Sequence, residues 1–341
     1  MGNAYLEELI ALVYDINNTR NKRSKCEKIF RFSSYGAYLY YTGRINSIEF
    51  DCVIKKINND VEEKYYNRER NNCVKKLFKN NDILFDFFRE MALIYQKYAI
   101  ESKEDDFNKN IYNDLIEFMK YMGCYDIFLK LKDMRHISQE TSRLDHSICI
   151  DNRDESYIIL KNKSFFHNCL DLSHEIAHAY ENTILKNRKK YFDSNYNVEI
   201  MSITFNRIFI EFLYQKGSIT KEEKICLLNN FELNYNNFTE WSLFISAAMM
   251  TKHFDIFDYD ISIYTDEKVI NRSLTDYNYA IGRIVSFHLF DRWMQNDKEF
   301  IKDIPEITMH LHNLKIRDLV NKYGDLNVAN EELAKTFVKR Y

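Results

Sequence analysis

Residues that break helices are scarce in this sequence, which has one Pro and seven Gly in 341 residues. Pro and Gly are the two residues that helix interiors tolerate least, and they mark most turns and loops. A chain with so few of them is biased towards long helices. Hydrophobic residues nevertheless make up 45% of the total, which indicates a globular protein with a sizeable core and excludes a disordered one.

Four other features that the sequence lacks bear on the class of protein. No apolar run approaches the length of a membrane span, so we expect no membrane partner. There is no excess of positive charge, because 48 Lys and Arg face 51 Asp and Glu, and this argues against a nucleic-acid partner. The seven Cys form no C-x-x-C pair, and the N-terminus has no signal-peptide apolar region. Both features favour a cytoplasmic protein with reduced thiols.

Apolar residues at helical spacing dominate the rest of the sequence. After residue 135 two short β-favouring runs, 147–150 and 157–160, flank a turn-like segment and predict a hairpin. We therefore expect a mainly α fold with a small β-hairpin, and a boundary that separates an N-terminal helical region (1–130) from a second domain (131–341). Helices are predicted over residues 4–16 and 111–122, and in two or three segments within 45–100. From residue 168 on, one helix is predicted after another, including those over 197–215, 237–253, 268–294, 306–322 and 327–340.

The most specific pattern lies at residues 172–180, Leu-Ser-His-Glu-Ile-Ala-His-Ala-Tyr. Residues four apart share a helix face, so His174 and His178 can direct both imidazoles at one point. Glu175 is close enough to reach a water held there. This H-E-x-x-H spacing is typical of zinc metalloproteases, in which the Glu is the general base. The alternative is a helix with two partly buried His and a solvated Glu, but the apolar residues around the motif favour the metal site.

A catalytic zinc site needs a third protein ligand and an open position for water. Glu199 begins the next predicted helix and can present its carboxylate if that helix crosses the first, with the small Ser202 permitting close approach. Glu181 would have to lean along its own helix, and Asp193 is a further candidate in the connection. The alternative for Glu199 is an acid at a helix N-terminus, favoured there by the helix dipole.

Three blocks, in this order, resemble the zinc oligopeptidases typified by thimet oligopeptidase and oligoendopeptidase F. Residues 157–162 and 172–179 look like the edge strand and the metal helix of that family. Residues 199–206 are similar to the helix that supplies its metal-binding Glu, and residues 277–282 to a Tyr-bearing helix that closes over the substrate. The resemblance covers about residues 155–290.

This resemblance implies a helical zincin-type fold and one Zn²⁺ ion, with His174, His178 and Glu199 as its ligands. It also implies Glu175 as the general base. Tyr279 and, second to it, Tyr277 would donate hydrogen bonds to the tetrahedral oxyanion.

The substrate site follows from the same resemblance. An edge strand made of Tyr157, Ile158, Ile159 and Leu160 would bind an extended peptide by β-augmentation, using backbone groups rather than side chains.

The sequence departs from the family at three points. Ala177 stands where the family usually has Gly in the metal helix. The stretch 267–275 lacks the His that precedes the family's Tyr-bearing helix, so one transition-state donor is missing or replaced, for example by Arg272. The chain is also much shorter than family members commonly are.

The sequence therefore predicts a shortened, gluzincin-type zinc metalloendopeptidase that acts on short peptides, with residues 131–341 as its catalytic domain. Two alternatives stay open. The missing His and the short length favour a non-catalytic helical zinc-binding or interaction module derived from such a peptidase. A zinc protease dedicated to one protein target would share the site and differ only in its cleft.

Overall fold

The structure is a computed structural model. It describes residues 4–20, 28, 32, 35–56, 107, 109–139, 147–151, 155–161, 163–187, 199–233, 267–314, 316–325, 327 and 331, without the side chains of 54, 187, 229–233, 267–278, 280 and 316–317. The predicted helix over 237–253 lies outside these residues. So does the 57–100 part of the helices predicted within 45–100, and only residues 327 and 331 of the predicted helix over 327–340 are described.

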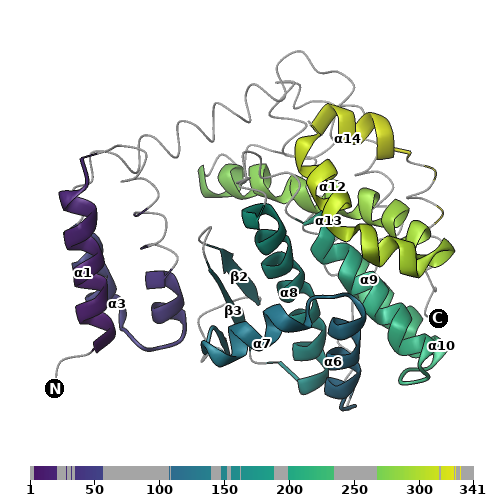
Figure 1. The fold of residues 1–341 in the computed structure, drawn as a ribbon, viewed down its shortest axis with the longest axis horizontal. Coiled ribbons are helices and arrows are strands. Elements are labelled where there is room, and N and C mark those ends of the chain that lie inside the picture. Colours follow the sequence, from purple (N-terminus) through teal and green to yellow (C-terminus); the bar gives the residue numbers. More distant parts are fainter. Residues whose placement is uncertain are drawn as a thin grey trace. The chain divides into compact units, whose positions relative to one another are not determined.

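Most described residues are helical, and one small sheet accompanies the helices (Figure 1). The predicted mainly α fold is thus confirmed. The chain divides into two compact units, one of residues 1–72 and 124–191, the other of residues 73–123 and 192–341. The predicted domain boundary near residue 130 stays a prediction. No described helix has both the length and the apolar character that a membrane crossing requires.

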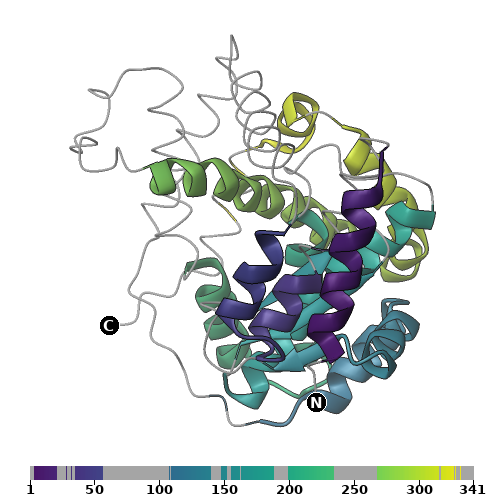
Figure 2. The same ribbon diagram turned by 90° about the vertical axis from the view of Figure 1, so that its left-hand side faces the viewer.

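The first unit contains helices α1 (Ala4–Asn18), α3 (Ser47–Ile54), α7 (Tyr125–Asp133) and α8 (Phe165–Asn187). Figure 2 shows α1 and α3 side by side. The buried face of α1 shares a hydrophobic core with strand β3, to which Tyr157 and Ile159 contribute. Helix α8, which contains His174 and His178, packs on the same small sheet and on α7. The first unit therefore holds α8 against the sheet.

The sheet consists of β1 (Ile137–Gln139), β2 (Ile148–Asp151) and β3 (Ser156–Leu160). β2 and β3 pair antiparallel, which confirms the predicted hairpin. The short β1, which the sequence did not predict, pairs parallel with β3 on its other side.

The strand order β1-β3-β2 makes β3 the central strand. The prediction that 157–160 forms an edge strand is therefore wrong, because β1 and β2 already occupy its two hydrogen-bonding edges. All five residues of β3 are buried, whereas those of β2 are half-buried. Tyr157, Ile158, Ile159 and Leu160 thus have no free strand edge to offer a peptide.

The second unit contains α6 (Tyr112–Tyr121), α9 (Ile200–Gln215), α10 (Lys221–Leu233), α12 (Glu267–Gln295), α13 (Asp297–Asn313) and α14 (Ile316–Tyr323). Helix α9 is buried along most of its length and packs most extensively on α12. Across this contact the guanidinium of Arg207 lies 4.0 Å from the ring centre of Phe287. This packing brings the first turn of α9 against the middle of α12.

One predicted helix differs in its bounds. The expected helix over 306–322 is instead two helices, α13 and α14, and α13 begins at Asp297, well before Pro305. The side chain of Asn296 caps it by accepting a hydrogen bond from the backbone N–H of Glu299 at 3.3 Å. A capped start and the buried Phe300 and Ile304 carry the helix through Pro305, although Pro offers no N–H to an earlier carbonyl.

Candidate metal centre

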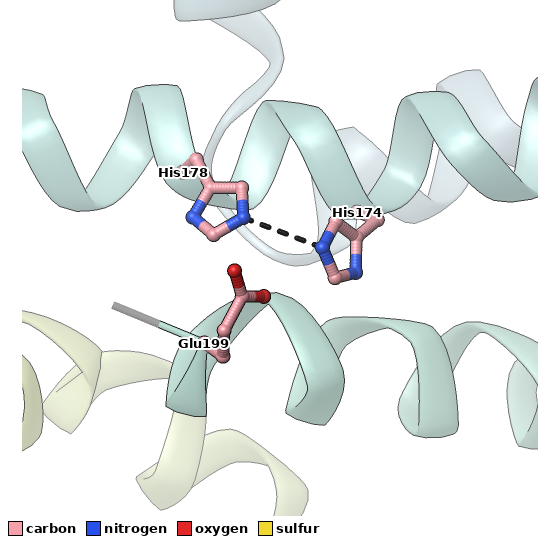
Figure 3. Close-up of side chains that lie close together, drawn as sticks. All are labelled: His174, His178 and Glu199. Atoms are coloured by element: carbon pink, nitrogen blue, oxygen red, sulfur yellow. Dashed lines mark hydrogen bonds between the residues drawn. The ribbon is translucent and has the colours of Figure 1, made fainter. Parts of the chain in front are cut away.

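The two His of the motif lie on one face of α8, as their spacing predicts. Ile176 and Ala177 between them are buried, so the helix is fixed on its apolar side while both rings are half-buried. The Nε2 atoms of His174 and His178 face each other at 3.3 Å (Figure 3). Two nitrogens bound at about 2.0–2.1 Å in tetrahedral geometry stand about 3.3–3.4 Å apart. The spacing of the imidazoles is therefore that of two ligands of one zinc ion.

Glu199 immediately precedes α9, and its side chain makes no capping hydrogen bond to the helix. Its carboxylate instead accepts a hydrogen bond from the Ser202 hydroxyl, with Oγ 3.0 Å from Oε2. The same hydroxyl contacts the Glu199 carbonyl oxygen at 3.1 Å. Ser202 is fully buried and Glu199 nearly so. The carboxylate is thus held in one orientation, which an acid that only served the helix dipole would not require.

His174, His178 and Glu199 form a cluster that could hold a metal ion. One ligand atom from each lies within 4.8 Å of the other two, and Figure 3 shows the carboxylate directed at the imidazoles. Two neutral imidazoles and one carboxylate are a donor set of catalytic zinc sites, and three protein ligands leave one position for water. The residues therefore fit the ion that the sequence implies.

Of the other candidates for the third ligand, the structure describes only Glu181. Glu181 is buried in α8 but is not among the clustered residues. Asp193 lies outside the described residues.

Helix α12 makes an unusually close contact with Glu199. A Cβ atom added at Gly282 would lie 3.1 Å from both the carbonyl carbon and the Cβ of Glu199, and 2.8 Å from Cδ1 of Ile203. Only Gly allows the two helices this approach. Tyr279 is three residues earlier, hence on the same face of α12, and is half-buried. The side chains of Tyr277 and Arg272 lie outside the described residues.

The contact at Gly282 predicts that Gly282→Ala lowers metal affinity more than it lowers stability. Ala is favoured over Gly in a helix by about 1 kcal/mol, which offsets part of an overpacking cost of about 1–3 kcal/mol. The added methyl group pushes against the backbone of Glu199, so we expect zinc affinity to fall about tenfold or more, as for other residues that orient a ligand. Chelator competition and thermal unfolding of the metal-free protein measure the two effects separately.

A double variant serves as the control for Gly282→Ala. Adding Ile203→Val removes the atom that the new Cβ meets first, at 2.8 Å, but leaves the contact with Glu199. It should restore stability and not zinc affinity. Equal recovery of both would show that Gly282 matters for packing alone.

Strand β2 runs past Glu175, the predicted general base. Glu175 is buried, with 5% of its surface exposed. Burial, together with the nearby carboxylates of Asp151 and Glu175, raises the pKa of the Cys149 thiol well above its usual range. Cys149 lies in the middle of β2, so this strand, and not β3, combines a sheet edge with proximity to the base.

Asp151 is a residue of this region that the sequence did not single out. The sequence predicts Asp151 in a turn, but in the structure it is the last residue of β2 and pairs with Ser156 of β3. Burial raises the pKa of its carboxyl to about 6, while a hydrogen bond from Ser156 and the nearby ring of His178 oppose that rise. Only the pairing of β2 with β3 and their packing on α8 bring it there.

Comparisons with known proteins add little to this geometry. No protein-family model matches the chain, and no curated protein matches it. Among solved structures, one described as "PZ peptidase A with inhibitor 2" is similar at a TM-score of 0.48 and 12% sequence identity, over 96% of this chain and 70% of that one. A likeness this weak indicates neither a family nor an activity for this chain.

Proposed function

We propose that this protein is a zinc-dependent metallopeptidase that hydrolyses short peptides. The observation that carries the proposal is the convergence of His174, His178 and Glu199, whose ligand atoms lie within 4.8 Å of one another. The H-E-x-x-H spacing is a local pattern that chance can produce. A third ligand of the right chemistry, 21 residues after His178, is a separate requirement that chance seldom meets.

The residues around the cluster supply the parts that peptide hydrolysis needs. A zinc ion, when bound, lowers the pKa of a coordinated water to about 7 and polarises the carbonyl that the water attacks. Glu175 accepts the proton of the attacking water and returns it to the departing amine. Tyr279 donates its O–H to the oxyanion that develops, and donors directed at that charge are a major source of rate.

The peptide, in this proposal, binds along the outer edge of β2. Within the described residues no strand pairs with that edge, and β2 passes close to Glu175. An added strand uses backbone hydrogen bonds, which are the same for every sequence. This binding mode replaces the one predicted for Tyr157–Leu160 and favours a broad choice of side chains.

Metal analysis combined with a peptide digest tests the proposed function. The purified protein should contain one zinc ion and cleave a library of fluorogenic peptides. A chelator should abolish cleavage, and added Zn²⁺ should restore it. Cleavage that persists at full rate in metal-free protein would overturn the proposal.

The same experiment separates the two alternatives. Stoichiometric zinc without cleavage of any peptide in the library would indicate a non-catalytic zinc-binding module. Cleavage of a single protein and of no short peptide would indicate a protease dedicated to one target.

A further inference from the structure

A polar cluster lies where β2, β3 and α8 meet, and it consists of the half-buried Asp151 and the buried Ser156 and Asn182. The Asn182 side-chain amide donates to Oδ1 of Asp151 at 3.3 Å and to Oγ of Ser156 at 3.1 Å. Ser156 also hydrogen-bonds to the Asp151 carboxylate. Asn182 and Ser156 are both buried. A carboxylate partly withdrawn from water is stabilised by such donors, and these hydrogen bonds fix its position.

This cluster lies beside the metal ligand His178. Asn182 follows His178 by four residues, so both side chains lie on the same face of α8, and β2 packs on that helix. The Asp151 carboxylate and the His178 ring are close enough to interact electrostatically. Because Nε2 of His178 faces His174, Nδ1 is the ring nitrogen that remains for a neighbouring residue.

A neutral imidazole can bind a metal through Nε2 only if its proton is on Nδ1. The group that accepts a hydrogen bond from Nδ1 therefore decides whether the ring is in the metal-binding tautomer. Carboxylates commonly take this role behind metal-binding His, where they also fix the ring orientation and make the ligand more basic.

We propose that Asp151 is a positioning residue for His178, in that its carboxylate accepts a hydrogen bond from Nδ1–H and keeps Nε2 turned to the metal position. Asn182 and Ser156 hold Asp151 in place. This inference rests on the proposed metal site but concerns the chain before any metal binds. The competing role is a purely structural one, in which Asp151 only ties the hairpin to α8.

Asp151→Asn distinguishes the two roles, because an amide oxygen can still accept the hydrogen bond from Asn182 but lacks the charge that selects the tautomer. The matched control is Glu155→Gln, the same loss of one carboxylate in the same hairpin. Glu155 accepts its hydrogen bond from the Tyr157 hydroxyl at 2.8 Å. Competition with a chelator for Zn²⁺ gives the affinity, and thermal unfolding of the metal-free proteins gives the stability.

We expect Asp151→Asn to lower zinc affinity about 10–100-fold, and Glu155→Gln to leave it within about threefold. A second readout uses ¹⁵N NMR of metal-free protein labelled in His, with the His178 signals assigned by their loss in His178→Gln. The wild type should show His178 protonated on Nδ1, and Asp151→Asn a mixture of tautomers.

Each result decides a specific point. Unchanged zinc affinity in a less stable Asp151→Asn would overturn the positioning role and leave the structural one. If Asp151→Asn does not fold, the tautomer of His178 in the wild type decides, and protonation on Nε2 there overturns the inference. A wild type that binds no zinc would instead overturn the proposed function, while the NMR result would still apply to Asp151.

Discussion

Glu175→Gln should lower the peptidase kcat by about 10²–10⁴-fold, the usual contribution of a general acid or base, and leave zinc binding unchanged. The amide has the size and nearly the shape of the carboxylate but cannot accept the proton of the attacking water. Glu175 is not one of the three clustered ligands, so the metal content should not change. Steady-state kinetics with a fluorogenic peptide and metal analysis of the same sample measure both quantities.

Glu175→Asp provides the control for this experiment. It keeps a carboxylate and withdraws it by one methylene group, so activity between that of the wild type and that of Glu175→Gln is expected. A Glu175→Gln variant with the full kcat would remove the residue from the role of base. A variant that had lost its zinc would show that the residue acts on the metal site rather than in the chemical step.

His178→Ala should abolish both zinc binding and peptidase activity. It removes one of three ligands, so the loss of affinity should exceed the ~10–100-fold that replacement of an outer-shell partner typically costs. The remaining His174 and Glu199 could not hold the ion against a chelator. Chelator competition gives the affinity, and the peptide assay at saturating Zn²⁺ shows whether activity returns.

His167→Ala is the matched control, because His167 lies on the same helix, two turns before His174. Its Nδ1 is 2.7 Å from Oγ of Ser164, and it is not among the clustered residues. Its loss should change zinc affinity by less than about threefold. If His178→Ala keeps the wild-type affinity, the metal site described above does not exist, and the roles of Glu175 and Tyr279 fall with it.

The local part of the site could be predicted because helix geometry depends on short spacings alone. The four-residue interval between His174 and His178 brings their rings to one face of any α-helix that contains them. Apolar neighbours such as Ile176 indicate which face of that helix is buried. The structure agrees, with the two Nε2 atoms 3.3 Å apart.

Glu199 could be predicted as a metal ligand only on the condition that its helix crosses the helix of the two His. The sequence indicated an acid at the start of a helix, a feature that the helix dipole alone explains. Two contacts are decisive. The Ser202 hydroxyl, three residues further on, donates a hydrogen bond to the carboxylate, and Gly282 approaches closely from far along the chain. The sequence shows that Gly is rare, but it does not show that Gly282 packs against Glu199.

The sheet shows where prediction from local pattern failed. A hairpin between neighbouring runs is a local structure, and it was predicted correctly. The position of β3 within the sheet depends on β1, a strand of three residues that pairs with it from about 20 residues away. A run of three residues carries almost no periodicity, so neither β1 nor the role of Asp151 beside His178 could be inferred.

The sequence by itself determined the helical character, the hairpin and the pair of imidazoles, because each follows from spacings of a few residues and from the scarcity of Pro and Gly. Only the tertiary structure decided which acid joins the His, which strand is central in the sheet and which carboxylate lies behind His178. These depend on pairings between distant segments, whose register and approach are set by packing and leave no periodic trace in the sequence.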